Sequence, residues 1–454
     1  MIVPRNRLIF WAAALTPFWA LAPVGHEAAL AAAGLSAALT ILALLDAWRA
    51  GSRLTGLEIK PPEVVRLTKD RDGRIDIYVE NQNPALRRLR LGLALPREIV
   101  SPNPDLVIEL PPTATSSVAA WPCRASRRGR YFLRRCFLEA ASPLGFWAVR
   151  RSRPIRTEVR VYPNLLSERQ HLAALFLRRG GLGVHAQRQI GKGRDFEKLR
   201  EYQPSDSYDD IYWKATAKRA FPVTKIFQIE RTQEVYVILD ASRLSGRGAS
   251  RVSERRLARR PDGPEAATIL ERFVTAALIM GLAAEKQGDL FGLLSFSDRV
   301  KSFIRAKNGR AHYDACREAL YTVQPEAVTP DFNEVFTFVT LRLRRRALLV
   351  FLTNMDDPVL AESFVRNINM VSRRHLVLVN MIRPPGARPL FSSPDVKGTD
   401  DLYRNLGGHY LWASLRETER VLKQKRVAFY TLENERLCAD LVSQYLGVKQ
   451  RQAL

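Results

Sequence analysis

Two apolar runs without a charged residue dominate the beginning of the hydropathy pattern. They cover residues 8–24 and 28–45, and each is close to the length that a helix needs to cross a hydrocarbon core. Only three residues, Gly25–Glu27, separate them, which is enough for a tight hairpin. We predict two transmembrane helices, at about 8–24 and 28–48, within residues 1–53. A buried helical hairpin of a soluble protein is the alternative interpretation.

The charges around this pair predict its orientation. Arg5 and Arg7 precede it, Arg49, Arg53 and Lys60 follow it, and its turn carries no Lys or Arg. Because positive residues mark the cytoplasmic side of a membrane, both flanks are expected in the cytoplasm. This predicts a multi-pass protein of the cytoplasmic membrane whose soluble domains face the cytoplasm.

Residues 54–163 follow a different pattern, in which apolar and polar residues alternate over short segments. In residues 74–81, for example, Ile75, Ile77 and Val79 share one face of an extended chain. Asn-Pro, Asp-Gly and Pro-Pro pairs separate such segments, which predicts a small β-sandwich-like domain.

Residues 231–454 alternate continuous apolar runs with helical patterns. Runs such as Val235–Leu239 are typical of strands buried on both faces. The alternation predicts an α/β domain with a doubly wound, mostly parallel sheet, whose ligands bind at the carboxyl ends of the strands. Residues 164–230 lie between the two domains and are predicted to be a linker followed by a polar block.

Composition adds a strong positive charge. The 454 residues include 71 Lys and Arg against 46 Asp and Glu, a formal net charge of +25, which favours an anionic partner such as nucleic acid, acidic protein or lipid. Six Arg in residues 247–260 fit an acidic partner or a solvated insertion, and no aromatic residue alternates with them as base stacking requires. Eleven Arg in residues 122–160 fit either anionic headgroups or a solvated strand face. The four cysteines form no CxxC pair, which argues against a zinc site.

One strand end carries a candidate metal site. Asp240 and Ser242 directly follow the run Val235–Leu239, and this spacing can direct a carboxylate and a hydroxyl at one point. The pair resembles the Asp-x-Ser-x-Ser metal-adhesion motif of von Willebrand factor A domains. Leu244 and Asn354 stand where that motif and a later strand end usually carry Ser and Asp. Asp240 alone would hold Mg²⁺ weakly, so no cofactor is expected. The alternative is that Asp240 and Ser242 cap a helix or hydrogen-bond their own loop.

The polar block "GRDFEKLREYQPSDSYDDIYWKATAKR", residues 193–219, contains a set of residues that resembles a known family signature. Together with the segment Ser142–Val149, it resembles bacterial membrane proteins of the domain-of-unknown-function 58 family. The block residues that we single out as a partner-binding or interdomain surface are Arg200, Glu201, Tyr202, Asp206, Trp213 and Lys214. The chain departs from the family pattern at Ser205, Asp209, Asp210 and Tyr212.

The resemblance implies a non-enzymatic interaction or adaptor protein. Its implied partner is a MoxR-type AAA+ ATPase, and its implied role is the assembly or maturation of client proteins at the membrane. Two alternatives remain, namely a metal-assisted hydrolase at Asp240 and a nucleic-acid-binding membrane protein, although no specific nucleic acid is expected. The block itself can serve equally as a brace between domains.

Overall fold

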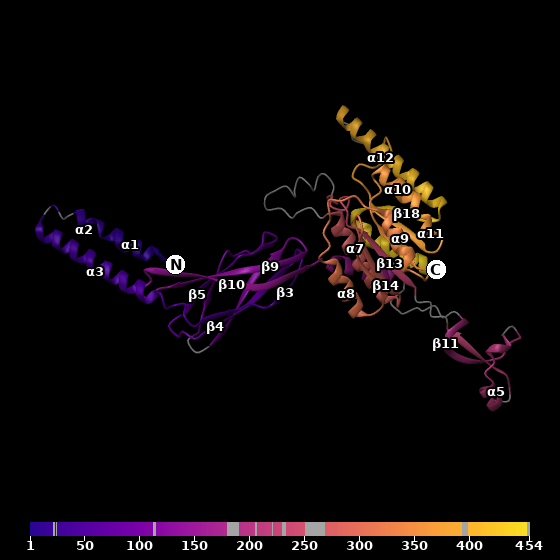
Figure 1. Cartoon of the computed structure of the whole chain (residues 1–454), viewed down its shortest axis with the longest axis horizontal. Helices are drawn as coiled ribbons and strands as arrows, with labels where there is room; N and C mark the ends of the chain where they lie inside the picture. Colours follow the sequence, from indigo (N-terminus) through magenta and orange to yellow (C-terminus); the bar gives the residue numbers. More distant parts are fainter. Residues whose placement is uncertain are drawn as a thin grey trace. The chain divides into compact units, whose positions relative to one another are not determined.

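The computed structural model describes residues 1–20, 23, 25–111, 115–178, 190–204, 207–219, 221–228, 233–249, 268–392 and 398–451. The chain divides into two compact units, Met1–Asn164 and Leu165–Leu454 (Figure 1). Each unit is described by itself below.

The first unit begins with a short strand and a helical segment. β1 (Ile2–Pro4) is followed by α1 (Asn6–Ala14), α2 (Thr16–Ala20) and α3 (His26–Ala50). α1 and α2 lie beside α3 (Figure 1), and the Trp19 indole donates a hydrogen bond to Ser36 Oγ at 3.0 Å. Among the described residues, α3 is the one helix long and apolar enough to cross a membrane. The predicted first span is thus divided into α1 and α2, in keeping with Pro17, whose ring cannot continue a preceding helix without a break.

Both ends of this helical segment are attached to the same strand, β10 (Trp147–Tyr162). β1 pairs antiparallel with the beginning of β10, so that Ile2 faces Val149. Near the other end, Asp46 of α3 is buried and accepts three hydrogen bonds from the loop that leads into β10: from Ser142 Oγ at 2.5 Å, Leu144 N at 2.9 Å and Phe146 N at 3.2 Å. The helical segment therefore leaves the β domain and returns to it at one place.

The rest of the first unit is a two-sheet β domain. One sheet has the order β1-β10-β9-β5-β7 with β3 paired to β10, and the other has the order β2-β4-β8-β6. Apolar side chains from both sheets form one core, which includes Ile75, Ile77 and Val79 as the alternation predicted. The remaining strands are β2 (Leu57–Lys60), β3 (Val64–Thr68), β4 (Asp72–Asn81), β5 (Arg88–Leu93), β6 (Ile99–Val100), β7 (Leu106–Glu109), β8 (Ser116–Ala125) and β9 (Gly129–Ala141).

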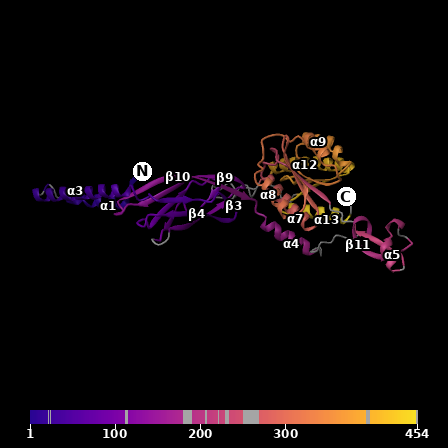
Figure 2. The same ribbon diagram turned by 60° about the horizontal axis from the view of Figure 1, so that its bottom comes forward.

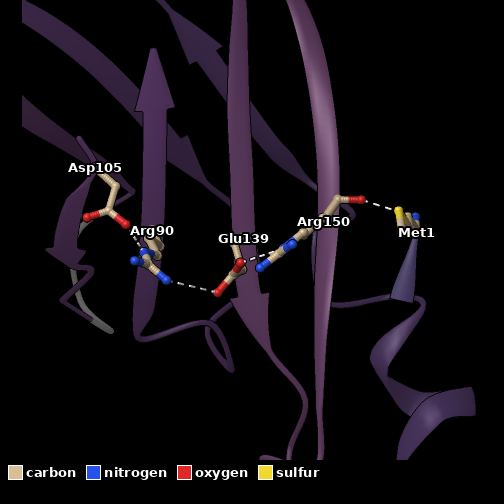
Figure 3. A network of polar contacts seen from close by, with 5 residues as sticks. All are labelled: Met1, Arg90, Asp105, Glu139 and Arg150. Atoms are coloured by element: carbon tan, nitrogen blue, oxygen red, sulfur yellow. Dashed lines mark hydrogen bonds and ion pairs between the residues drawn. The ribbon is translucent and has the colours of Figure 1, made fainter. Parts of the chain in front are cut away.

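A row of polar contacts crosses the larger sheet in strand order (Figure 3). Asp105 contacts Arg90, Arg90 lies 3.6 Å from Glu139, and Glu139 lies 2.7 Å from Arg150. The row ends at β1, where the Met1 ammonium donates to the Arg150 carbonyl at 3.1 Å. The arginines are about half exposed, so each pair stabilises the sheet only slightly.

The second unit is built on a six-stranded sheet with the order β15-β14-β13-β16-β17-β18. All neighbouring strands are parallel except β15, which pairs antiparallel at the edge. This confirms the predicted α/β pattern with a mostly parallel sheet. The strands are β13 (Glu234–Asp240), β14 (Leu290–Phe296), β15 (Val300–Lys307), β16 (Leu348–Leu352), β17 (Leu376–Ile382) and β18 (Val427–Leu432).

Helices cover both faces of this sheet (Figure 2). The core on one face includes residues of α4, α7, α8 and α13, and the core on the other includes residues of α9, α10, α11 and α12. The helices are α4 (Leu166–Arg178), α7 (Ile269–Lys286), α8 (Arg310–Leu320), α9 (Phe332–Arg342), α10 (Pro358–Asn367), α11 (Asn369–Ser372), α12 (Thr399–Gln424) and α13 (Leu437–Gln450), the last preceded by the 3-10 turn η3 (Asn434–Arg436). The 26-residue helix α12 was not predicted, because Gly407 and Gly408 and many charges obscure its period. In the segment predicted as a linker, Leu165 and Leu172 belong to the core of the second unit.

The polar block forms a small hairpin of its own. β11 (Ile190–Glu201) pairs antiparallel with β12 (Val223–Gln228), and the connection contains the 3-10 turn η2 (Tyr208–Asp210) and helix α5 (Trp213–Arg219). Among the side chains of the hairpin that the structure describes, Ile211 and Val223 are buried and apolar. They lie 12 residues apart, Ile211 in the connection and Val223 in β12, so no amphipathic period in the sequence connects them.

Candidate functional site

The candidate site lies where the sheet of the second unit changes winding direction. From the central strand β13 the chain continues to β14 on one side and later to β16 on the other. The carboxyl ends of β13 and β16 are adjacent, since Leu239 pairs with Leu352. Ligands of doubly wound sheets bind at such points, and Asp240 and Thr353 stand there.

Asp240 is fully buried and both of its carboxylate oxygens accept hydrogen bonds. The Ser242 backbone N–H donates to Oδ1 at 2.8 Å, and the Thr353 hydroxyl donates to Oδ2 at 2.6 Å. The second bond joins residues from the ends of the two strands. Burial raises the pKa of Asp240, while the bonds from Thr353 and Ser242 act in the opposite direction. Among the alternatives that the sequence left open, the loop hydrogen bond of Asp240 is thus present.

The residues that depart from the metal-adhesion pattern belong to the same closed arrangement. Leu244 is fully buried among the apolar side chains of one core, and its carbonyl accepts a hydrogen bond from Asn354 Nδ2 at 3.3 Å. Ser245 donates to the Ser242 carbonyl at 2.8 Å, so its hydroxyl is used inside the loop. Asn354 Oδ1 is buried without a hydrogen-bond partner.

This donor set fits Mg²⁺ poorly. A magnesium ion requires near-octahedral oxygen ligands and usually one or two carboxylates. Here Asp240 is the one carboxylate at the motif positions, both of its oxygens accept hydrogen bonds, and Leu244 contributes an apolar side chain at a ligand position. No cluster of three or more His, Cys, Asp or Glu that could hold a metal occurs in the described part of the chain.

Two ion pairs, which sequence reasoning missed, lie beside this loop. Arg243 lies 3.6 Å from Asp357, and Arg247 contacts Asp356. They link the loop after β13 to the loop after β16, in addition to the buried bond between Asp240 and Thr353. The signal in the sequence was the pair of aspartates two residues beyond Asn354.

The block residues do not gather at this site, and they are placed on the hairpin as follows. Trp213 is 65% exposed and Lys214 is exposed at the beginning of α5, while Arg200 and Glu201 end β11. The Tyr202 ring lies 5.8 Å from the ring of Tyr208. Asp206 lies outside the described residues. Within the described hairpin, no ion pair joins Glu201 or Lys214 to another member of the set.

All four cysteines are buried and unpaired with one another. Burial raises the pKa of the Cys123 and Cys136 thiols to about 11, and of the Cys316 and Cys438 thiols to about 12. Since the thiolate is the reactive form, these residues are unsuited to nucleophilic catalysis.

The fold and the site together describe a multidomain α/β protein with an apolar N-terminal helix and a closed strand-end loop. Residues 198–389 match the model of the family described as "Protein of unknown function DUF58". The match begins in β11 and extends past β17, so it includes the polar block from residue 198 onward and the Asp240 loop. It supports the predicted family resemblance over this part of the chain.

The curated relatives that match this chain are uncharacterized proteins. An uncharacterized protein of Mycobacterium bovis and another of Mycobacterium tuberculosis are 22% identical over 197 residues, which is 43% of this chain and 56% of theirs. The chain therefore spans about half the length of the curated relatives it matches.

Solved structures are more distant. Proximal thread matrix protein 1 of the mussel byssus has a TM-score of 0.24 at 13% identity, covering 47% of this chain and 45% of that one. An uncharacterized membrane spanning protein from Vibrio fischeri has a TM-score of 0.17 at 12% identity, covering 48% of this chain and 98% of that one. Similarity at this level carries no argument about function.

Proposed function

We propose that this chain is a membrane-anchored interaction protein that acts with a MoxR-type AAA+ ATPase on client proteins and performs no catalysis of its own. The observation that carries the proposal is the exposed aromatic surface of the polar block. Trp213 is 65% exposed and Tyr208 is 74% exposed, on a hairpin within the range that matches the family model. Large exposed aromatic residues are frequent energetic centres of protein interfaces.

The Asp240 loop supports an interaction role rather than a hydrolytic one. A general base or metal ligand needs a carboxylate that can reach a substrate or ion. The Asp240 carboxylate is buried and engaged by Ser242 and Thr353. In this proposal the α/β unit is a von Willebrand A-like domain that has kept the strand order and the Asp240 loop without a competent metal site.

The membrane part of the proposal is a helical hairpin with both flanks in the cytoplasm. Its support is the attachment of both ends of the helical segment to β10, through β1 and through Asp46. A segment that leaves and returns at one place fits two antiparallel crossings, with α1 and α2 forming the first. Reporter fusions placed after Gly51 and at Leu454 test this, and a periplasmic signal at either position contradicts it.

The partner surface is tested with Trp213→Ala in the full-length chain. Because the side chain is mostly exposed, the thermal midpoint should change little, while capture of the ATPase from solubilised membranes should be lost. Tyr78→Ala removes an exposed aromatic side chain from β4 and is the matched control. Unfolding of the hairpin by Trp213→Ala, or unchanged capture, refutes the assignment of this surface.

A magnesium titration separates the proposal from the hydrolase alternative. Calorimetry should detect no binding to the full-length chain below roughly millimolar Mg²⁺, because carboxylate ligands are scarce. Tighter binding that Asp240→Ala abolishes would favour the hydrolase.

A further inference from the structure

A hollow of about 460 Å³ lies in the first unit, between the beginning of α1 and the loop that precedes β10. Its lining combines two polar side chains with four apolar or aromatic ones. The lining residues are Asn6, Arg7, Phe10, Trp11, Leu144 and Phe146. The loop is the one that Asp46 of α3 binds, so the hollow lies where the helical segment joins the β domain.

The cation in this hollow is Arg7. Among the described residues, no carboxylate forms an ion pair with Arg7. The Asp46 carboxylate, which binds the same loop, is buried, whereas the Arg7 side chain is exposed to solvent. The positive charge of Arg7 is therefore available to an anion from outside the chain.

Gly145 lies in close contact with the Arg7 side chain. A Cβ atom at this position would lie 3.2 Å from Arg7 Nη1 and 3.4 Å from Arg7 Cδ. The residue also has a φ of +79°, a conformation that glycine adopts without strain. Glycine thus allows the guanidinium side chain to lie against the loop at the edge of the hollow.

The apolar part of the lining faces outward. Phe10, Trp11 and Leu144 are all exposed, which is unfavourable in water but suits contact with lipid. Tryptophan is also enriched at the level of lipid headgroups. The α3 helix beside this segment is also apolar and mostly exposed, as a helix in contact with lipid would be.

We propose that this hollow binds the headgroup of an anionic phospholipid. The Arg7 guanidinium matches phosphate oxygens as a two-pronged donor, and Asn6 adds a neutral hydrogen-bonding group. The glycerol and the first acyl carbons lie along Phe10, Trp11 and Leu144. Free phosphate has no apolar part that could contact these side chains, whereas a phospholipid has one, so a lipid fits the hollow better. This inference rests on the proposed membrane anchoring of the chain.

The test is native mass spectrometry of the full-length chain in detergent micelles, titrated with phosphatidylglycerol, phosphatidylcholine or inorganic phosphate. Phosphatidylglycerol should be retained preferentially. Arg7→Gln should weaken its retention about tenfold, the size expected when one charge-assisted contact is lost. Arg7→Lys, which keeps the charge but not the fork, should give an intermediate loss. Arg153→Gln removes an exposed arginine of β10 and should change nothing.

Equal retention by wild type and Arg7→Gln overturns the proposal, and so does an equal loss in Arg153→Gln, which would indicate a general charge effect. Displacement of the lipid by low millimolar phosphate also overturns it in favour of a simple anion site. Failure of the proposed function is a separate result, because it is measured by the reporter fusions and by ATPase capture, and neither enters the lipid titration.

Discussion

Asp46 in the first unit and Asp240 in the second are both buried aspartates, yet they connect different kinds of chain segment. Asp46 joins the end of an apolar helix to a loop of the β domain, through three donors from that loop. Asp240 joins the ends of two neighbouring strands, through one donor from each. In both units a buried carboxylate surrounded by neutral donors holds chain segments together, and its place in the fold decides which segments.

The largest effect is expected from Asp46→Ala. The change leaves the Ser142 hydroxyl and two backbone N–H groups without their acceptor, so the first unit should lose about 3–5 kcal/mol of unfolding free energy. Thermal unfolding and limited proteolysis of the full-length chain in detergent measure the loss. Ser142→Ala removes one of the three donors and should cost less than half as much. A neutral result for Asp46→Ala would show that other contacts suffice to attach the helical segment, such as β1 and the hydrogen bond from the Trp147 indole to the Ala43 carbonyl.

The contribution of Asp240 to stability depends on pH. Its folded-state pKa is raised, so the stability it contributes is fully present below its unfolded value near 3.8 and decreases as pH rises through the folded pKa. Asp240→Asn should remove this dependence and be at least as stable as wild type near neutral pH, because its amide can donate to Thr353 Oγ1. Asp240→Ala should instead destabilise the second unit by about 2–3 kcal/mol. Unfolding midpoints between pH 3.5 and 7 separate these outcomes.

His375 in the second unit titrates in the opposite sense. Burial lowers its pKa from 6.5 to about 4, and its Nδ1 accepts a hydrogen bond from the Ala347 N–H at 3.3 Å. Its contribution to stability is therefore present above pH 6.5 and lost as pH falls through about 4. In a plot of the unfolding midpoint against pH, His375→Gln should reduce the decrease on the acidic side. An unchanged decrease would mean that other groups, such as paired carboxylates, govern acid unfolding.

The smallest effect is expected at Glu139, an acidic residue of the first unit that lies on the surface of the sheet. It pairs with Arg90 and Arg150 in the polar row (Figure 3). Glu139→Gln should cost no more than about 1 kcal/mol and less in high salt, as for other solvent-exposed ion pairs. Urea unfolding at two salt concentrations checks this. A loss comparable to that of Asp46→Ala would erase the contrast between a buried carboxylate and one whose partners are about half exposed.

The sequence predicted those parts of the fold that depend on repeated local patterns. The buried strand β13 and the alternating strand β4 both follow from the spacing of apolar residues. Position in a strand was also enough to single out Asp240. The sequence could not show that its oxygens are engaged by Thr353, 113 residues away, because that contact depends on the strand order.

Other features lacked any local signal. In the sequence, Asp46 is the first charged residue after an apolar run. Nothing near it indicates that it binds a loop 96 to 100 residues later. β1 is three residues long and is defined only by its pairing with β10. The exposure of Trp213 likewise depends on which few side chains, such as Ile211 and Val223, fill the interior of the hairpin.

The length of β10 has a mechanical consequence. The strand contains 16 residues, so at the usual rise per residue it extends roughly 50 Å. Its first residues hold β1 and adjoin the Asp46 loop, and its last residues lie just before the second unit begins at Leu165. A single covalent strand, supported by β9 along most of its length, therefore connects the helical segment to the end of the β domain. A force that displaces or tilts the helices would therefore be transmitted along β10 to Tyr162. The strand would bend most easily at the register shift between Pro154 and Thr157.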